Sequence, residues 1–282
     1  MNGIVISLDP IILRIGDFEM RWYSVIVILA VVVAGVIWEH QSRKKGIPSG
    51  EIYRLAPWAL VAGLVGARLF HVIDHWNFYV ANPLQIIQLQ QGGLAIWGVI
   101  AGVTVTTIIY ARLRHLPLGR LMDAAVPAIL VALILSRLAC TINGDAPGGV
   151  TSLPWGFIYT HPDAMIPAGL FGVPTHPYPV YEMLWNGTIL VLVWRLGAHL
   201  KRDGLLFLGS LSLYSMGRFV LTFVRQENIT LWGLQQAQVI ALITLLASLA
   251  VIIYLVWLRQ HIRRKTNWES LQQKMLNEEA KN

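Results

Sequence analysis

The sequence predicts an all-α integral membrane protein with seven transmembrane helices, the N-terminus outside and the C-terminus in the cytoplasm. Three observations lead to this prediction: the composition, the length of the apolar segments and the placement of Lys and Arg. Of the 282 residues, 55% are hydrophobic and only 13% are charged. Soluble domains carry about 25% charged residues, so this composition favours a chain that lies largely in lipid.

Seven segments are long and apolar enough to cross a hydrocarbon core of about 30 Å. In chain order they are residues 22–39, 53–72, 93–110, 121–141, 180–196, 205–224 and 239–258. The second, fourth and sixth contain arginine and the fifth contains Glu182, so their assignment rests on length and flanks as well as hydropathy. We expect one seven-span domain over residues 1–265 and a polar cytoplasmic tail, 266–282, that forms a loosely held helix.

Lys and Arg are concentrated on alternate connections, and this bias sets the predicted orientation. The connections after the first, third, fifth and seventh segments are basic, with residues such as Arg43, Arg112, Lys201 and Arg263. The intervening connections contain no Lys or Arg: residues 73–92, 142–179 and 226–238. Only Arg14 and Arg21, before the first segment, run against the pattern. The formal net charge of +7 is therefore a topology signal, and it favours anionic lipid surfaces over nucleic acid as a partner.

Metal, disulfide and signal-peptide motifs are missing from the sequence. The single cysteine, Cys140, excludes an internal disulfide and a CxxC metal site. No HExxH or similarly close ligand spacing occurs, so His71 and His75 are expected to cap the second helix. Residues 1–20 lack the features of a removable signal peptide. We expect neither a metal nor a soluble cofactor.

Five arginines lie inside or at the edge of apolar segments: Arg54, Arg68, Arg137, Arg218 and Arg225. A charge in this position costs at least about 2.5 kcal/mol, so each arginine needs a partner or a function. Few acidic residues are close in sequence, and a guanidinium fork suits an external anion such as a phosphate. The alternatives are that Arg225 snorkels to the membrane edge, and that Arg54 and Arg68 pair with Asp123 or helix-end carbonyls.

The most unusual composition is on the outer side. Residues 142–179 contain seven Pro and six Gly, together with His161, His176, Asp145 and Asp163. Glycines at 144, 148 and 149 would let backbone N–H groups approach an anion closely, although the same composition also fits a flexible loop. Glu182 follows this segment, and it is expected to serve either as the counter-ion of an arginine or as a general base.

Motifs in a fixed order along the chain resemble those of the prolipoprotein diacylglyceryl transferase family. They are Asp9-Pro10-Ile11 and Arg21-Trp22-Tyr23, Gly66-Ala67-Arg68, the run 92–98, the run 136–148, the run 176–182, and Tyr214-Ser215-Met216-Gly217-Arg218 with Phe223-Val224-Arg225-Gln226. The resemblance covers nearly the whole chain. It implies a bacterial inner-membrane enzyme that transfers the diacylglyceryl group of phosphatidylglycerol to the lipobox cysteine thiol of preprolipoproteins. A thioether forms and glycerol 1-phosphate is released, which is the first step of lipoprotein maturation.

The resemblance also implies a site toward the outer side of the membrane. Arg137 and Arg218 are expected to hold the phosphate, with support from Arg225 and Arg68. The other expected substrate-binding residues shape the site or position the lipid, and they are Tyr23, Trp97, Asn143, Gly144, Gly148, His176 and Tyr214. Asp145, Glu182 and His176 are alternative acceptors of the thiol proton. The nucleophilic cysteine belongs to the substrate, so Cys140 is not expected to react.

Five positions depart from the family pattern. Trp97 replaces a histidine, Cys140 an asparagine, Ala139 a glycine, and Asp145 and Thr222 each a glutamate. Trp97 has no titratable group, so that position does not supply a base here. These departures motivate one alternative, a non-catalytic member that binds phospholipid or lipoprotein precursors. The buried arginines motivate another, a transporter of organic anions, which the lack of an internal repeat disfavours.

Overall fold

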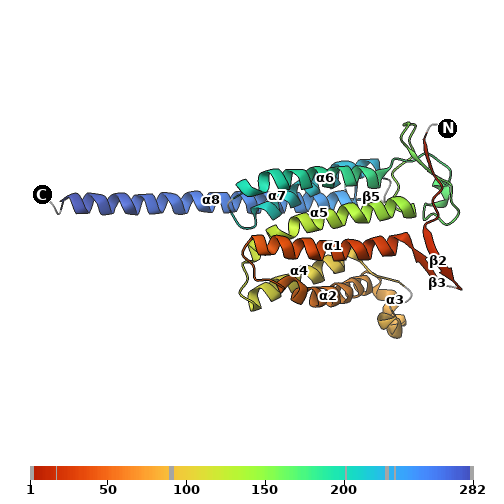
Figure 1. Ribbon diagram of the computed structural model, residues 1–282, viewed down its shortest axis with the longest axis horizontal. Coiled ribbons are helices and arrows are strands. Elements are labelled where there is room, and N and C mark those ends of the chain that lie inside the picture. Colours follow the sequence, from red (N-terminus) through yellow and green to blue (C-terminus); the bar gives the residue numbers. More distant parts are fainter. Residues whose placement is uncertain are drawn as a thin grey trace. The chain divides into compact units, whose positions relative to one another are not determined.

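The computed structural model describes residues 3–16, 18–88, 92–200, 202–225, 229–231 and 233–279, without the side chains of 198, 229–231 and 259–279. The chain is mostly helical, as predicted (Figure 1). Within the described residues, six helices are long and apolar enough to cross a membrane. They are α1 (Trp22–Lys44), α2 (Glu51–Asp74), α4 (Ile96–Leu113), α5 (Leu118–Asn143), α7 (Leu205–Leu221) with its 3-10 turn, and the apolar part of α8 (Gln236–Glu279). The protein is therefore an integral membrane protein.

The remaining predicted span, residues 180–196, lies on α6 (Tyr178–Leu196), which is not one of these six. The helix itself is present and has 19 residues. Its buried positions include two polar residues, Glu182 and Asn186. These polar residues lower the hydropathy of α6, although their side chains are enclosed by protein.

The backbone divides into two compact units, Ser24–Ser136 and the combination of Met1–Tyr23 with Arg137–Asn282. In the first unit, α2 and α4 pack with their backbones in close approach because glycines face each other. A Cβ atom on Gly98 would collide with the backbone of Gly66, and one on Gly102 would collide with the backbone of Ala62. The small residues in the predicted motifs around 66 and 98 thus set the spacing of these two helices.

The first unit is also held by two buried glutamates, Glu39 and Glu51. Glu39 accepts hydrogen bonds from the backbone N–H of Gly50 at 2.7 Å and from Arg43 at 2.8 Å. Glu51 accepts from Tyr110 and Arg54, each at 2.8 Å, and from Arg114 at 2.9 Å. Arg54 therefore has a carboxylate partner within its own helix, Glu51, which was not among the partners expected for it.

In the second unit, α7 packs against both α6 and α8 (Figure 1). Trp185 packs on α7 where Gly217 leaves room for its indole, and its Nε1–H donates to the carbonyl of Leu213 at 3.0 Å. The hydroxyls of Ser212 and Ser248 hydrogen-bond at 2.8 Å and join α7 to α8. The helix α8 continues to Glu279, so the described part of the predicted polar tail is helical, as expected.

Three small two-stranded sheets were not predicted. β1 (Ile4–Ile6) pairs in parallel with β4 (Phe157–Tyr159), β2 (Ile11–Ile15) pairs antiparallel with β3 (Phe18–Arg21), and β5 (Ile229–Leu231) pairs antiparallel with β6 (Leu234–Gln235). Strand β3 continues directly into α1.

The Gly- and Pro-rich segment between α5 and α6 is tied down by backbone hydrogen bonds. Gly148 and His176 bond at 3.0 Å, and Gly149 donates to the carbonyl of Val224 at 2.8 Å. His176 in turn donates to the carbonyl of Gly149 at 2.9 Å. These bonds anchor both ends of the segment beside the last turn of α7, so it is not a loose connection.

Candidate functional site

Arg137, Glu182 and Arg218 meet in the second unit, each from a different helix. Arg137 lies near the end of α5, Glu182 in the first turns of α6 and Arg218 near the end of α7. Arg218 Nη1 donates to Glu182 Oε1, and Arg137 Nε makes an ion-pair contact with Oε2 without hydrogen-bond alignment. The side chains of the two arginines are 19% and 18% exposed and that of Glu182 is 5% exposed.

Arg137 and Arg218 therefore share one carboxylate, that of Glu182. Of the two roles expected for Glu182, the contacts match the counter-ion. A single carboxylate still leaves an excess of positive charge between the helices, and a buried excess charge is costly unless a further anion binds.

Tyr178, one turn before Glu182, lies at the centre of this cluster and is fully buried. Its hydroxyl donates to Glu182 Oε1 at 2.9 Å and accepts from Arg218 Nη1 at 2.8 Å. The guanidinium carbons of Arg137, Arg218 and Arg225 lie 6.0, 5.8 and 5.4 Å from its ring centroid. Contacts of this kind between a cation and an aromatic ring are attractive.

Among the residues that the structure describes, three arginines and one glutamate contact Tyr178. Arg225, for which snorkelling was the alternative, faces this ring. Tyr178 was not among the predicted site residues. The signal that could have revealed it is its position four residues before Glu182, which puts both side chains on one helix face. We call Tyr178, Glu182, Arg137, Arg218 and Arg225 the arginine cluster.

The end of α5 connects the arginine cluster to the outer segment. Arg137 Nη1 contacts Cys140 Sγ at 3.8 Å, and Cys140 is buried. Asn143 donates to Asp145 Oδ1 at 3.1 Å and accepts from Arg21 at 3.4 Å. Asp145 also interacts with Cys140, so contacts link Arg137, Cys140 and Asp145.

Two glycines set the course of the backbone after α5. Gly144 has φ +80°, a left-handed conformation that ends α5 and turns the chain. A side chain at Gly148 would collide with His176 and crowd the carbonyl of Val224. The nearby Tyr159 hydroxyl donates to the carbonyl of Thr141 at 2.9 Å, and burial raises the pKa of Tyr159.

Two further predicted residues, Tyr23 and His176, also belong to the second unit. Tyr23 interacts electrostatically with Cys140, Asp145 and Arg137. His176 Nδ1 lies 3.3 Å from the hydroxyl of Tyr181. The structure thus brings Tyr23 to the end of α5, and it places His176 beside Gly148.

Arg68 and Trp97 lie in the first unit, Ser24–Ser136. The guanidinium of Arg68 is surrounded by five backbone carbonyls, from Gln85, Ile86, Gln88, Gly92 and Gly93. A guanidinium has five N–H donors, so none is left over for an anion in this arrangement. The alternative in which Arg68 binds carbonyls is the one observed. Trp97 lies in the first turn of α4 and is 38% exposed.

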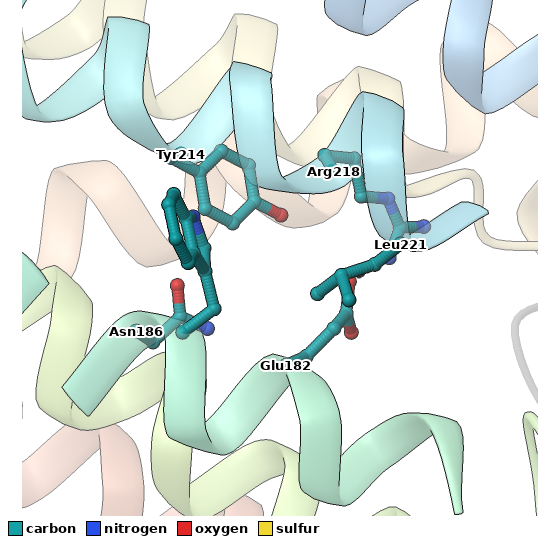
Figure 2. Close-up of a pocket in the computed structure, with 6 residues that line it drawn as sticks. Glu182, Asn186, Tyr214, Arg218 and Leu221 are labelled. Atoms are coloured by element: carbon teal, nitrogen blue, oxygen red, sulfur yellow. Dashed lines mark hydrogen bonds and ion pairs between the residues drawn. The ribbon is translucent and has the colours of Figure 1, made fainter. Parts of the chain in front are cut away.

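A gap too narrow to hold a water molecule lies between α6 and α7 beside the arginine cluster. It is lined by Glu182, Trp185, Asn186, Tyr214, Arg218 and Leu221. Figure 2 shows Glu182 and Asn186 on α6 facing Tyr214 and Arg218 on α7. Tyr214, which was expected to position lipid, therefore lines the same gap as the predicted phosphate ligand Arg218.

His71 and His75 were expected to cap α2, and His75 is its C-terminal cap. The helix ends at His75, whose backbone N–H donates to the carbonyl of His71 at 3.0 Å. An unpredicted group consists of Asp9, His161 and Asp163, whose side chains each place one atom able to bind a metal within 4.8 Å of the others. Asp163 already pairs with Arg14 at 3.2 Å.

Comparison with known proteins identifies similar sequences. The family model described as prolipoprotein diacylglyceryl transferase matches residues 10–254. A phosphatidylglycerol–prolipoprotein diacylglyceryl transferase of Lysinibacillus sphaericus (strain C3-41) is 32% identical over 260 residues, which cover 90% of this chain and 94% of the relative. Proteins of the same name are 35% identical in Dehalococcoides mccartyi (strain CBDB1), over 88% of this chain and 94% of the relative, and 32% identical in Listeria monocytogenes serotype 4b, over 90% and 91%.

Proposed function

Since the chain belongs to the prolipoprotein diacylglyceryl transferase family, we propose that it transfers the diacylglyceryl group of phosphatidylglycerol to the lipobox cysteine of a preprolipoprotein. The products are a diacylglyceryl thioether on that cysteine and glycerol 1-phosphate. The observation that carries the proposal is the arginine cluster, in which three guanidiniums and one carboxylate surround Tyr178. This excess of positive charge suits a phosphate.

The reaction places negative charge where the arginines are. The substrate sulfur forms a bond to the glycerol carbon, the bond from that carbon to the phosphate oxygen breaks, and glycerol phosphate leaves. Negative charge grows on the leaving oxygen, and it is stabilised by the mostly buried Arg137 and Arg218 together with Arg225. Tyr178 and Glu182 hold the guanidiniums in place, which avoids reorganisation during the reaction.

The thiol proton must pass to a base, and the contacts narrow the choice among the three candidates. Both oxygens of Glu182 are engaged by the arginines, so we assign it to positioning. Asp145, with one oxygen held by Asn143, and His176 remain as acceptors of the proton. Of these two we favour Asp145, because Cys140 contacts both Asp145 and Arg137 and so places Asp145 close to the arginine cluster.

We propose further that α6 is the seventh span and that the N-terminus is outside the bacterial inner membrane. The 19-residue length of α6 and the burial of its polar residues support the seventh span. The one-sided placement of Lys and Arg supports the orientation. Because Arg137 lies near the end of α5 that leads into the lysine- and arginine-free segment, the site opens toward the outer side.

Topology predicts that a reporter fused at Asp163 faces away from the cytoplasm while one fused at Arg263 faces it. The physical reason is the bias of short basic connections toward the cytoplasm. Paired fusions to alkaline phosphatase and to a cytoplasm-dependent fluorescent protein measure it. Cytoplasmic fluorescence from the fusion at Asp163 would contradict the orientation.

Replacement of Cys140 by serine is expected to leave at least about half of the transfer rate. The substrate provides the nucleophile, and serine keeps most of the volume at this buried position. Transfer to a lipobox peptide measures the rate, and mass analysis of the wild type looks for an adduct on Cys140. Loss of transfer together with a diacylglyceryl adduct on Cys140 would establish a two-step reaction and contradict this assignment.

The function as a whole is tested by complementation of a bacterium depleted of its own diacylglyceryl transferase. We expect the wild-type gene to restore growth and diacylglyceryl-modified lipoproteins, and Arg218→Ala to accumulate in the membrane without restoring either. A non-catalytic lipid-binding protein or an anion transporter would restore neither. Failure of the wild type to modify any lipoprotein would reject the proposal.

A further inference from the structure

The side chain of Gln235 binds the backbone on both sides of the turn that leads from α7 to Arg225. The last carbonyls of a helix cannot bond within it and need other donors. After α7 the chain forms the 3-10 turn η5 (Thr222–Val224) and becomes extended at Arg225. Gln235, the last residue of β6, donates from Nε2 to the carbonyl of Thr222 at 3.1 Å and to that of Arg225 at 2.7 Å.

Gln235 is itself held by the start of α8. This helix begins at Gln236, and Gln238 in its first turn accepts a hydrogen bond from the backbone N–H of Gln235 at 2.9 Å through its Oε1. A side chain that reaches back in this way is half of a capping box, which fixes the entry to a helix. Gln238 is buried, so water does not compete for this bond.

The two carbonyls also decide which way the Gln235 amide faces. Its Oε1 is buried and has no hydrogen-bond partner among the residues that the structure describes. In the reversed orientation this oxygen would face the two carbonyls, and none of the three atoms could donate. The Nε2 group of Gln235 is therefore directed at the turn before Arg225.

The backbone around Arg225 is bound at three atoms. The N–H of Arg225 donates to the carbonyl of Thr222 at 3.0 Å, and its own carbonyl accepts from Gln235. The preceding carbonyl, that of Val224, accepts from the N–H of Gly149 at 2.8 Å. Of these three contacts only that of Gln235 comes from a side chain, so a single substitution can remove it.

The guanidinium of Arg225 depends on this anchoring. It lies 5.4 Å from the ring centroid of Tyr178, within the arginine cluster. A rotation of the backbone at residue 225 would be carried to the end of a long side chain. Displacing a group of an active site by about 1 Å can lower the rate about a hundredfold.

We propose that Gln235 is a positioning residue for the transfer reaction. It fixes the backbone of Arg225 so that the guanidinium stays in the arginine cluster, where it stabilises the charge on the leaving glycerol phosphate. Gln235 does not touch the substrate and acts through Arg225. This inference rests on the proposed function.

The test uses the full-length protein in proteoliposomes, with phosphatidylglycerol as donor and a lipobox peptide as acceptor. Gln235→Met removes both N–H donors and keeps an unbranched side chain of similar length. Gln236→Met is the matched control, because Gln236 is the same residue type, adjacent in the chain and exposed. Each substitution is also made in the Arg225→Ala variant, which lacks the group to be positioned.

We expect Gln235→Met to lower kcat/KM at least about tenfold and Gln236→Met to leave it unchanged. Arg225→Ala alone should lower kcat/KM by at least as much as Gln235→Met. In the Arg225→Ala variant, Gln235→Met should have a further effect of less than about twofold, because residues that act as a unit are not additive. A residue that only supports the fold would cause the same loss in both backgrounds.

Reaction of Arg225 with phenylglyoxal follows the position of its guanidinium without any turnover. Its rate, measured by mass analysis of peptides, should be at least about twofold higher in Gln235→Met than in the wild type and in Gln236→Met, because a released segment opens more often. This measurement decides the outcome where transfer by Arg225→Ala is below detection. If Gln235→Met does not accumulate in the membrane, Gln235→Leu takes its place with the same expectations.

An equal loss from Gln235→Met in both backgrounds would mean that Gln235 only supports the fold, and it would overturn the inference. Wild-type transfer by Gln235→Met or by Arg225→Ala, or an unchanged rate of Arg225 modification, would overturn it as well. All of these results leave transfer by the wild type intact. Absence of transfer by the wild type would instead reject the proposed function, and this inference with it.

Discussion

Arg137→Lys and Arg218→Lys are each expected to lower kcat/KM for transfer from phosphatidylglycerol at least about a hundredfold, as the loss of one charge-stabilising donor does in other active sites. Lysine keeps the positive charge but loses the planar fork that can bind Glu182 and a phosphate at the same time. Both side chains are mostly buried, so solvent cannot replace the lost donors. Transfer to a lipobox peptide, normalised to the amount of membrane-inserted protein, measures the effect.

Arg54→Lys is the matched control, because Arg54 also pairs with a buried glutamate but has a side chain that is 63% exposed. It should retain nearly the full transfer rate. Rates close to that of the wild type in both Arg137→Lys and Arg218→Lys would show that these two arginines are structural, and the phosphate would have to bind elsewhere.

Glu182→Gln is expected to cause the largest loss of stability. Removing one partner from a buried charge pair typically costs about 3–5 kcal/mol, because the other charge is left uncompensated. Here two arginines would lose their shared negative charge, although the amide oxygen of glutamine could still accept from the Tyr178 hydroxyl. Thermal unfolding of the detergent-solubilised protein should therefore shift to a clearly lower temperature.

Glu19→Gln is the control for this prediction, since Glu19 pairs with Arg14 at 3.1 Å on the surface with a side chain that is 38% exposed. Surface pairs contribute about 0–1 kcal/mol, so its unfolding temperature should barely change. Added phosphatidylglycerol should recover part of the loss in Glu182→Gln, because the phosphate can replace the missing negative charge. An unfolding temperature equal to that of the wild type would mean that Glu182 is not the counter-ion of the two arginines.

The helices were predictable because their signal is local. A long apolar run is by itself evidence for a membrane-spanning helix. The predicted segment 121–141, for example, falls within α5, Leu118–Asn143. The segment 180–196 also lies on a helix, although α6 carries Glu182 and Asn186. The strand pairs were missed because they join distant residues, such as Ile4 with Phe157, and short strands carry little pattern of their own.

Most residues of the candidate site could be predicted from the sequence, but the contacts between them could not. A charged arginine in an apolar segment has a high free-energy cost, so Arg137, Arg218 and Arg225 could be identified from the sequence. That Arg137 and Arg218 share Glu182 could not be foreseen, because the three residues come from three helices. Tyr178 was overlooked because a tyrosine at the start of a transmembrane helix is usually an interfacial anchor.

The fate of the oxygen that joins the diacylglycerol carbon to phosphorus is the most direct test of the arginine cluster as the site that expels phosphate. Phosphatidylglycerol labelled with ¹⁸O at this oxygen is incubated with the protein and a lipobox peptide, and both products are analysed by mass. The account predicts equal amounts of unlabelled diacylglyceryl-thioether peptide and of glycerol 1-phosphate that retains the label. Labelled diacylglycerol, or transfer without release of glycerol phosphate, would contradict it.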